Sequence, residues 1–417
     1  MVPQELTHYI MKKYLLLLLV VALSFTTAFA ADESTITIKT SKPVGTTVSL
    51  DAYTASKDEA FTVDWGDGEE KIYNVDPDGW GYSRRIKTEI KGGTITIKGK
   101  LVNFDLTEAG ITSVDIHGQT ALKVINLKEN EIATFKQDGM PALTELNLRD
   151  NKLTTFSGTG MTSLKTLNLQ GNQLDSHEFD ITDASTTLTE LTVSDNGDKF
   201  ITLNLMAFTA LEYFYCDDNP EFTTAVFADN NANIKKISMN NCHVMHFYSR
   251  SFPNLYSLNL SNNALLDLEE GNYPKLSTLS IDHNYLTALD VTRFPNLESL
   301  YCGNNNITLL NVGNNPGLLS LNCDSLDITK LDISNNKDLA YLSVNGTKLT
   351  QLDIRGKRAI TTLNISNTAI RYIDLEDQYS LRDFRARNTQ CEFFYFNYIN
   401  PWGRFNYVDI RDNKKMT

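Results

Sequence analysis

Residues 255–310 contain LYSLNLSNNALLDL at 255, LSTLSIDHNYLTAL at 276 and LESLYCGNNNITLL at 297, three copies of one pattern spaced 21 residues apart. Each copy places apolar residues at positions 1, 4, 6, 11 and 14 and, in this stretch, asparagine at position 9. Apolar residues at alternate positions indicate a short strand with one buried face. The pattern therefore predicts a coil made of a strand, a sharp asparagine turn and a return segment.

The same frame covers most of the chain. The units that begin at Leu164, Leu188 and Leu211 carry insertions of three, two and two residues, which we place in the return loops. Such units are typical of leucine-rich repeats, which stack because one unit cannot bury its own apolar face. We expect a β-rich solenoid of about 14 repeats over residues 101–401, with a parallel β-sheet on its concave face. The units begin at residues 101, 122, 143, 164, 188, 211, 234, 255, 276, 297, 318, 339, 360 and 381.

Asparagine at position 9 has a structural role in this pattern. Its amide can hydrogen-bond to backbone groups buried at the turn, both in its own unit and in the neighbouring one. The last four units lack it, so we expect that end to depend more on packing. Position 9 holds Asn130, Asn151, Asn172, Asn196, Asn219, Asn263, Asn284 and Asn305, and then Leu326, Thr347, Thr368 and Thr389 in the last four units.

The five cysteines all fall on inward positions. Cys216, Cys302 and Cys323 occupy position 6, Cys391 occupies position 11 and Cys242 replaces the asparagine of position 9. We therefore interpret them as buried thiols that pack as small apolar side chains. Cys302 and Cys323 lie in adjacent units, so they are the pair that could form a disulfide, and the sequence leaves this open.

An aromatic-rich segment follows the last unit. Trp402, Phe405 and Tyr407 fit positions 1, 4 and 6 of a truncated fifteenth unit. We interpret residues 402–417 as this truncated unit and a C-terminal cap, in which basic residues such as Arg404 protect the free sheet edge.

The first 30 residues have the three parts of a signal peptide. Lys12 and Lys13 precede the apolar run YLLLLLVVAL, and the small-residue pattern Ala28-Phe29-Ala30 follows it. The run is about half as long as a membrane-spanning helix requires. We expect translation to begin at Met11, cleavage after Ala30, and an exported product without a transmembrane segment that is secreted, periplasmic or at the cell surface.

Residues 31–100 lie outside the repeat and alternate apolar and polar residues between turns, which predicts a small antiparallel β-sandwich-like domain. The turn Trp65-Gly66-Asp67-Gly68 within FTVDWGDGEE resembles the hairpin of PKD-like domains. Asp64 and Asp67, like the acidic residues of DPDGWG at 76, lack the spaced acidic series of a calcium loop, so we assign them to turns. We expect this domain to cover the open edge of the first repeat.

The signal peptide, the VDWGDG segment and repeats such as LESLYCGNNNITLLNVGNN together resemble internalin-like leucine-rich-repeat proteins of bacterial surfaces. The resemblance implies a right-handed curved solenoid that binds proteins or glycans, often in adhesion. The sequence departs from that family in having neither a wall-sorting motif nor a lipid-anchor cysteine.

Charge and motifs exclude several functions. A net charge of −13 disfavours a nucleic-acid partner. No Gly-x-Ser-x-Gly, phosphate-loop or His-Glu-x-x-His motif occurs, so we expect neither an enzyme nor a cofactor. A hydrolase that uses a pair of the many acidic residues is a weaker alternative. A zinc site formed by His243, His246 and Asp267 is a further hypothesis, and the competing interpretation places both histidines on a solvated turn.

Strand residues at positions 2, 3, 5, 7 and 8 are expected on the concave face, because alternate side chains of a strand point to opposite sides. Large rings there are not needed to fill the core, so they favour recognition. Three arginines near the C-terminal end of the same face form a second, cationic candidate. The candidate ligand-binding residues are Tyr213, Tyr215, Tyr256, Tyr301, Arg382, Arg385 and Arg387.

The sequence favours a non-catalytic, monomeric recognition or adhesion protein outside the cytoplasm, which binds a protein or a glycan on the concave face. An architectural protein of the cell envelope is the alternative.

Overall fold

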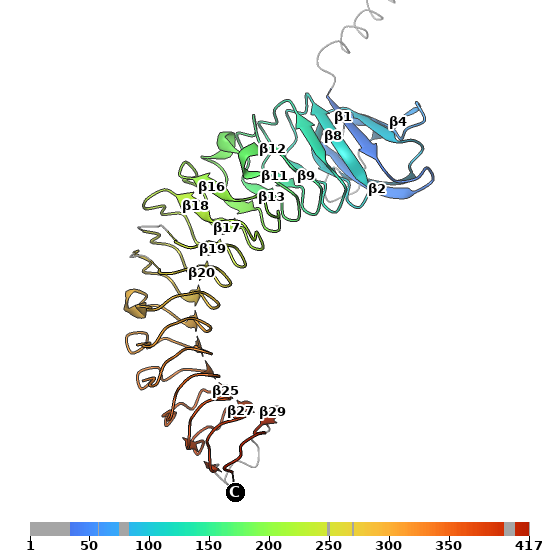
Figure 1. Cartoon of the computed structure of the whole chain (residues 1–417). Coiled ribbons are helices and arrows are strands. Elements are labelled where there is room, and N and C mark those ends of the chain that lie inside the picture. Colours follow the sequence, from blue (N-terminus) through green and yellow to red (C-terminus); the bar gives the residue numbers. More distant parts are fainter. Residues whose placement is uncertain are drawn as a thin grey trace, which may run out of the picture. The chain divides into compact units, whose positions relative to one another are not determined.

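The computed structural model describes residues 34–56, 58–74, 83–247, 251–268, 271–395 and 405–416. The expected signal peptide lies outside these residues. The chain forms two compact units: Met1–Leu153 with Thr159–Leu164, and Thr154–Gly158 with Lys165–Thr417. We call them unit 1 and unit 2 and describe each by itself (Figure 1).

Unit 1 contains two sheets that both continue across residue 100. In the first, β1 pairs antiparallel with β8, which pairs in parallel with β10. In the second, β2 pairs antiparallel with β7, which pairs in parallel with β9. Antiparallel strands thus cover the edge that the first coil would otherwise leave open. The first sheet has the order β10 (Thr134–Gln137), β8 (Ile111–His117), β1 (Thr35–Thr40), β6 (Thr94–Lys98), β3 (Ala60–Asp64), β4 (Glu70–Asn74), and the second β5 (Ser83–Glu89), β2 (Thr47–Thr54), β7 (Leu101–Asp105), β9 (Val124–Asn126), β11 (Glu145–Asn147).

The VDWGDG segment of unit 1 forms a turn around a buried ring. Trp65 is 1% exposed, and its indole Nε1 donates a hydrogen bond of 3.0 Å to the hydroxyl of Tyr73. Asp64 Oδ1 accepts hydrogen bonds from the backbone N–H groups of Gly66 and Gly68, at 2.8 and 3.0 Å. The carboxylate of Asp64 therefore holds the turn together, as the sequence predicts.

Unit 2 is the expected solenoid. Its long sheet is parallel, and each strand occupies positions 3 to 5 of its coil. In Figure 1 the strands follow one another along the curved unit, and β25 and β27 lie on the inner side of the curve. The strands are β13 (Thr166–Asn168), β15 (Glu190–Thr192), β17 (Tyr213–Tyr215), β19 (Lys236–Ser238), β20 (Ser257–Asn259), β21 (Thr278–Ser280), β22 (Ser299–Tyr301), β23 (Ser320–Asn322), β24 (Tyr341–Ser343), β25 (Thr362–Asn364), β27 (Asp383–Arg385) and β29 (Tyr407–Asp409).

The return segments of unit 2 contain only short elements. In the described part of the chain, no helix combines the length and the apolar character needed to cross a membrane. The short elements are the strand pairs β12 (Phe156–Ser157) with β14 (Phe179–Asp180), β16 (Thr202–Leu205) with β18 (Thr224–Phe227) and β26 (Ile373–Asp374) with β28 (Phe394–Tyr395), and the 3-10 helices η1 (Ser176–Glu178), η2 (Thr182–Ala184) and η3 (Val291–Arg293).

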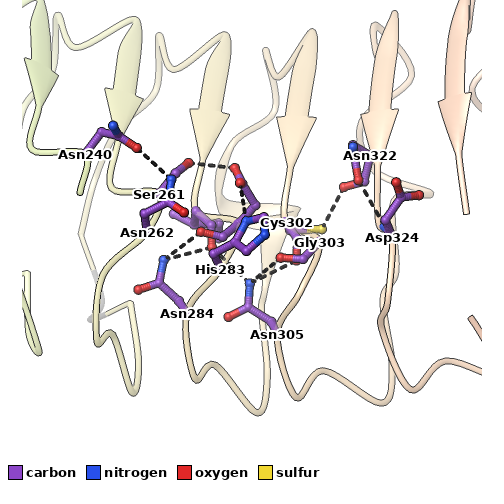
Figure 2. A network of polar contacts seen from close by, with 12 residues as sticks. Asn240, Ser261, Asn262, His283, Asn284, Cys302, Gly303, Asn305, Asn322 and Asp324 are labelled. Carbon is purple, nitrogen blue, oxygen red and sulfur yellow. Dashed lines mark hydrogen bonds and ion pairs between the residues drawn. The ribbon is translucent and has the colours of Figure 1, made fainter. Parts of the chain in front are cut away.

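The asparagines of position 9 form the predicted ladder. Asn284 Nδ2 donates to the carbonyl of Ile281 in its own coil at 3.0 Å and to that of Leu260 in the preceding coil at 2.9 Å. Its Oδ1 accepts from the backbone N–H of Leu265, also in the preceding coil, at 2.9 Å. Asn305 repeats this arrangement in the next coil (Figure 2). Each amide therefore joins two coils in a place that water does not reach.

Threonine replaces this amide incompletely near the C-terminal end. The hydroxyls of Thr347 and Thr368 donate to carbonyls of their own coils, Val344 at 2.8 Å and Ile365 at 2.7 Å. A hydroxyl has one proton to donate, whereas an amide has two, so these bonds stabilise the turn within a coil. Because threonine makes fewer bonds between coils than asparagine does, we still expect packing to contribute more to stability at this end.

A second buried column at position 19 was not foreseen from the sequence. In the middle coils it is aromatic: Phe252, Tyr273 and Phe294 stack with ring centroids 6.1 and 5.9 Å apart. In the next coil Asn315 occupies this position in place of an aromatic residue. Its Nδ2 donates to the carbonyls of Phe294 at 2.7 Å and Val291 at 3.1 Å. Asn336, Lys357 and Gln378 follow, all of them buried.

Position 8 is left-handed in every coil, which the sequence analysis also missed. The φ angles there lie between 51° and 73°, a region that glycine, asparagine and aspartate adopt more readily than other residues. The chain must turn sharply between the strand and the buried amide, so this backbone conformation recurs whatever residue is present. The residues are Glu108, Glu129, Asp150, Gly171, Asp195, Asp218, Asn241, Asn262, His283, Asn304, Ser325, Gly346, Asn367, Asn388 and Asp412.

The register predicted for the last coil is wrong by three residues. β29 pairs with β27 so that Tyr407 lies opposite Asp383, which is position 3 rather than position 6. The coil therefore begins at Phe405 instead of Trp402, and Asn413 falls on position 9. Its Nδ2 donates to the carbonyls of Ala386 at 2.7 Å and Ile410 at 2.6 Å, which continues the ladder. Trp402 and Arg404 lie outside the described residues.

All five cysteines are buried and unbonded, as the inward positions predict. Cys302 and Cys323 therefore do not form a disulfide in this structure. Burial away from water raises the pKa of both thiols. They remain protonated and act as part of the apolar core.

The ladder predicts a large difference between two asparagines. Asn284→Ala leaves the buried N–H of Leu265 without its acceptor. It also removes one of two amide donors from the carbonyls of Leu260 and Ile281, which keep their bonds to Asn263 and Asn305. We expect the variant to lower the free energy of unfolding by about 2 kcal/mol. Asn296→Ala is the control, because Asn296 is exposed and its Nδ2 makes one bond of 2.7 Å, to the carbonyl of Pro274. Guanidinium unfolding of both variants measures the difference, and equal midpoints would contradict the ladder.

The left-handed turn predicts opposite effects at two glycines. Gly346 has φ +73°, so Gly346→Ala should lower the free energy of unfolding by about 1–2 kcal/mol. Gly317 has no atom within 4 Å of an added Cβ and no positive φ, so Gly317→Ala should be neutral or slightly stabilising. Thermal denaturation of the two variants checks this, and a stabilised Gly346→Ala protein would rule out the conformational argument.

Candidate functional site

The outward side of the long sheet in unit 2 carries a cluster of rings and cations. Register places Tyr213 beside Lys236, and Tyr215 beside Ser238, on the neighbouring strands β17 and β19. The Nζ of Lys235 lies 5.8 Å from the ring centroid of Tyr213, and that of Lys236 lies 5.1 Å from the ring centroid of Tyr215. Tyr256, 42% exposed, immediately precedes the next strand, β20. We call these five residues the tyrosine–lysine cluster: Tyr213, Tyr215, Lys235, Lys236 and Tyr256.

Acidic residues surround the tyrosine–lysine cluster. Glu212 Oε2 lies 2.7 Å from Lys235 Nζ, and Asp217 Oδ1 accepts hydrogen bonds of 2.6 Å from both the hydroxyl of Ser238 and the N–H of Asn240. Burial raises the pKa of Asp217, and these hydrogen bonds partly oppose that shift. The cluster is therefore a compact mixture of rings, two ammonium groups and carboxylates.

The hydroxyl of Tyr215 is also difficult to ionise. Partial burial raises its pKa, and the negative charge of Glu190 and the neighbouring Tyr256 and Tyr213 raise it further. The phenol of Tyr215 therefore remains a hydrogen-bond donor over the whole physiological pH range. The ammonium group of Lys236 lies over the ring of the same tyrosine.

Tyr301 lies apart from the other three tyrosines of the candidate site. It is on β22, two strands beyond β20, and its hydroxyl accepts a hydrogen bond of 3.2 Å from Ser320 Oγ. Tyr341 lies on β24, two strands beyond β22, and its pKa is raised by burial, by Asp324 and by Tyr301. Leu319, 43% exposed, precedes the strand between them. Sequence reasoning overlooked Tyr341, although it occupies position 3 of the same frame.

A row of amides and carboxylates follows the strand ends of the same sheet (Figure 2). Asn262 Nδ2 donates to Asn240 Oδ1 at 2.9 Å, and Ser261 Oγ donates to Asp282 Oδ1 at 2.6 Å. His283 Nδ1 lies 2.8 Å from the other oxygen of Asp282. The first two bonds join neighbouring coils, and the third lies within one coil, so the polar groups are held in fixed positions at the surface.

Gly303 interrupts this row. A Cβ at this position would lie 2.9 Å from both the side-chain oxygen of Asn322 and the backbone oxygen of Asp324, so only glycine allows the two coils to approach this closely. Asp324 on its far side accepts from the hydroxyl of Ser343 at 2.5 Å. Gly303 therefore adds no side chain to this row of polar groups.

The three candidate arginines lie together at β27, and each has partners within the chain. The guanidinium of Arg385 lies 5.1 Å from the ring centroid of Tyr407, and Arg387 Nε lies 2.6 Å from Asp412 Oδ2. Arg382 donates to backbone carbonyls, that of Leu381 at 3.1 Å. Arg385 and Arg387 are exposed. Asp412 had not been recognised as a partner, because the sequence register placed the last coil three residues earlier.

The structure does not support the zinc hypothesis. His246 Nδ1 and Asp267 Oδ1 are 3.4 Å apart, as the stacking of their units predicts. Among the described residues, however, no group of three or more histidine, cysteine or acidic side chains is arranged to hold a metal ion.

Comparison with known proteins identifies the class. A family model described as "Leucine rich repeat" matches residues 135–174. The functional domain of InlJ from Listeria monocytogenes is similar in structure, with a TM-score of 0.62, 21% identity, and coverage of 73% of this chain and 67% of that chain. No curated protein sequence matches the chain.

Two further bacterial structures are similar. A leucine-rich-repeat protein from Leptospira interrogans has a TM-score of 0.59 and 18% identity, and the match covers 73% of this chain and 83% of that one. YopM from Yersinia enterocolitica has a TM-score of 0.56 and 18% identity, with coverage of 74% and 73%. The protein has the leucine-rich-repeat solenoid fold, and its solenoid is similar to that of an internalin domain.

Two aspartates predict opposite dependences of stability on pH. Burial raises the pKa of Asp217 above its ordinary value of 3.8, so the contribution of its carboxyl to stability is fully present below that pH and is lost as the pH rises through the raised pKa. Asp217→Asn keeps an acceptor oxygen but does not ionise. We expect the variant to be more stable than the wild type at neutral pH, and the difference to shrink on acidification.

Asp353 is the comparison. Its hydrogen bonds with Arg355 lower its pKa to about 2, so its contribution is present above its ordinary value of 3.8 and is lost as the pH falls. Asp353→Asn should therefore be less stable than the wild type at neutral pH, with the difference vanishing in acid. Urea unfolding at several pH values checks both variants, and the same sign for both would refute the assignment.

Proposed function

We propose that this protein is a non-catalytic recognition protein that binds a protein partner through the tyrosine–lysine cluster on the long sheet of unit 2. The observation that carries the proposal is that three tyrosines lie on a face where the fold does not require them. The core positions of the same coils are already filled by Leu211, Phe214 and Leu258, each 0% exposed. The rings of the cluster are therefore available for contact with a partner.

The chemistry of the cluster favours a protein over a uniformly charged ligand. Tyrosine offers a large contact area with a polar tip at a small cost in conformational entropy, and it is enriched among residues that dominate binding energy. Lys235 and Lys236 alternate with Glu212 and Asp217 on one small surface. Such a surface suits a partner that places acidic side chains against the lysines and basic side chains against the carboxylates. A partner that placed like charges together would be repelled.

Arg385 and Arg387 extend the proposed surface toward the last coil. Arg385 keeps an exposed guanidinium above the ring of Tyr407, whereas Asp412 already neutralises part of the charge of Arg387. We assign Arg385 and Tyr301 a secondary role in the contact, because both lie several strands from Tyr215.

Other parts of the proposal rest on the sequence. The signal peptide of residues 1–30 supports export to the cell surface, the periplasm or the medium, with the mature protein a monomer that acts in adhesion. The VDWGDG turn supports a PKD-like sandwich over residues 31–100, followed by the repeats of residues 101–401 and a C-terminal cap. Similarity to the solenoids of InlJ and YopM supports recognition in general terms.

The proposal predicts which tyrosines matter. The mature protein is screened against arrays of extracellular proteins and of glycans, and the affinity for the captured partner is measured by surface plasmon resonance. Tyr215→Ala and Tyr256→Ala should each weaken binding by about 1 kcal/mol or more without changing the melting temperature. Tyr301→Ala should have a smaller effect.

Tyr285→Ala is the matched control, because Tyr285 is 58% exposed but lies at position 10, beyond the strand and its turn. Its affinity should equal that of the wild type. Unchanged affinity in the Tyr215→Ala, Tyr256→Ala double variant would move the contact elsewhere, and capture of glycans alone would replace a protein partner with a carbohydrate.

A further inference from the structure

An open trough lies on the return segments of three consecutive coils, which begin at residues 318, 339 and 360. Its volume is about 730 Å³, within the range of ligand sites in general. It lies in unit 2, on residues at positions 12 to 17 that follow the turn of each coil, so it is separate from the tyrosine–lysine cluster. The trough has no part in the recognition proposed for the sheet.

Two rows of outward side chains form the walls of the trough, and apolar side chains form its floor: Leu352 and Ile354 are buried, and Leu331 is half-buried. Position 14 supplies the floor with Leu331 and Leu352, joined by Ile354. On either side of this row, positions 13 and 15 point outward, because the backbone is extended and side chains alternate. The first wall is Lys330, Gln351 and Tyr372, and the second is Asp332, Asp353 and Asp374.

The aspartates of the second wall are fixed in place by the fold. The Oδ1 of each accepts a hydrogen bond from the backbone N–H two residues later: Ser334 at 2.8 Å for Asp332, Arg355 at 3.0 Å for Asp353 and Glu376 at 3.0 Å for Asp374. These turns recur in every coil of the trough, so the carboxylates repeat once per coil. The wall is a rigid, evenly spaced row of acceptors.

The trough carries equal numbers of opposite charges. Lys330, Arg355 and Arg371 are its cations, and they balance the three aspartates of the second wall. Arg355 binds Asp353 directly, through contacts of 2.7 and 2.9 Å, which lower the pKa of that carboxyl to about 2. A charged ligand would therefore meet as much repulsion as attraction, whereas an uncharged polar ligand could bond to donors and acceptors alike.

A supported aromatic ring stands on the first wall. Tyr372 is 47% exposed, and the ring of Phe393 contacts it at a centroid distance of 5.6 Å and an interplanar angle of 66°. An edge-on contact of this kind holds a ring in place and leaves a face available. Together with the apolar floor, Tyr372 offers a flat surface for C–H groups between the polar walls.

We propose that this trough binds an extended, uncharged oligosaccharide. Sugar rings present hydroxyl groups around the edge and C–H groups on the face, which matches polar walls at the side and a phenol ring with an apolar floor beneath. A linear chain of sugars presents hydroxyl groups along its length, and each coil offers them one aspartate at the same position. Gln351, between the two end coils, supplies both a donor and an acceptor.

The test uses the mature full-length protein and isothermal titration with cellohexaose, chitohexaose and maltohexaose, with hexagalacturonate and a chitosan hexamer as anionic and cationic probes. We expect at least one neutral hexasaccharide to bind with a 1:1 stoichiometry and neither charged probe to bind more tightly. Tyr372→Ala and Gln351→Ala should each weaken this binding at least tenfold.

Two matched variants make the result specific. Tyr285→Ala removes an exposed ring outside the trough and should leave saccharide binding unchanged. Tyr215→Ala should also leave it unchanged, so loss of the protein partner at the sheet and loss of the saccharide at the trough can be told apart. Circular dichroism and the melting temperature establish that each variant is folded, and both trough substitutions are at exposed positions.

Several results would overturn the proposal. These are no heat of binding with any neutral hexasaccharide at millimolar concentration, tighter binding of a charged probe, or saccharide binding that survives both Tyr372→Ala and Gln351→Ala. Binding of an extended peptide that cellohexaose, chitohexaose and maltohexaose do not displace would assign the trough to a protein segment instead.

Discussion

The buried amide of position 9 is the interaction on which the solenoid depends. Asn284 and Asn305 each satisfy backbone groups of two coils at once, in a place without water. To bring the amide there, the preceding residue adopts a left-handed conformation, even when it is His283. The cost of that conformation, of order 1 kcal/mol, is smaller than that of several buried unpaired groups. In the coils that carry it, this amide therefore fixes the turn and joins each coil to the preceding one.

The position of the buried polar side chains within a coil differs along the solenoid. Asparagine is absent from position 9 in the four coils after Asn305, and buried polar side chains occupy position 19 in four consecutive coils, from Asn315 to Gln378. The column also includes Lys357, whose Nζ donates to the carbonyl of Ser334 at 3.0 Å and whose pKa is lowered by burial. The C-terminal coils are thus joined by polar contacts at the opposite turn, and their return segments carry the trough.

Because the core positions of every coil carry the stability, the outward positions can diverge in chemistry. Position 5 is asparagine or serine in many coils but Tyr215 and Tyr301 in two, and position 13 changes from Lys330 to Gln351 to Tyr372 in three successive coils. None of these changes alters the buried spacing. A solenoid can therefore carry two unrelated recognition surfaces, one on its sheet and one on its return segments.

The sequence by itself determined the repeat frame, the parallel sheet, the asparagine ladder and the burial of the cysteines, since each depends on spacing within a coil. The tertiary structure decided what depends on contacts between coils. The last coil begins at Phe405 because ladder bonds and strand pairing select Asn413, although the aromatic pattern favoured Trp402. Likewise, only stacking places Lys236 over Tyr215 and forms the trough, since the spacing within one coil does not determine how side chains of neighbouring coils meet.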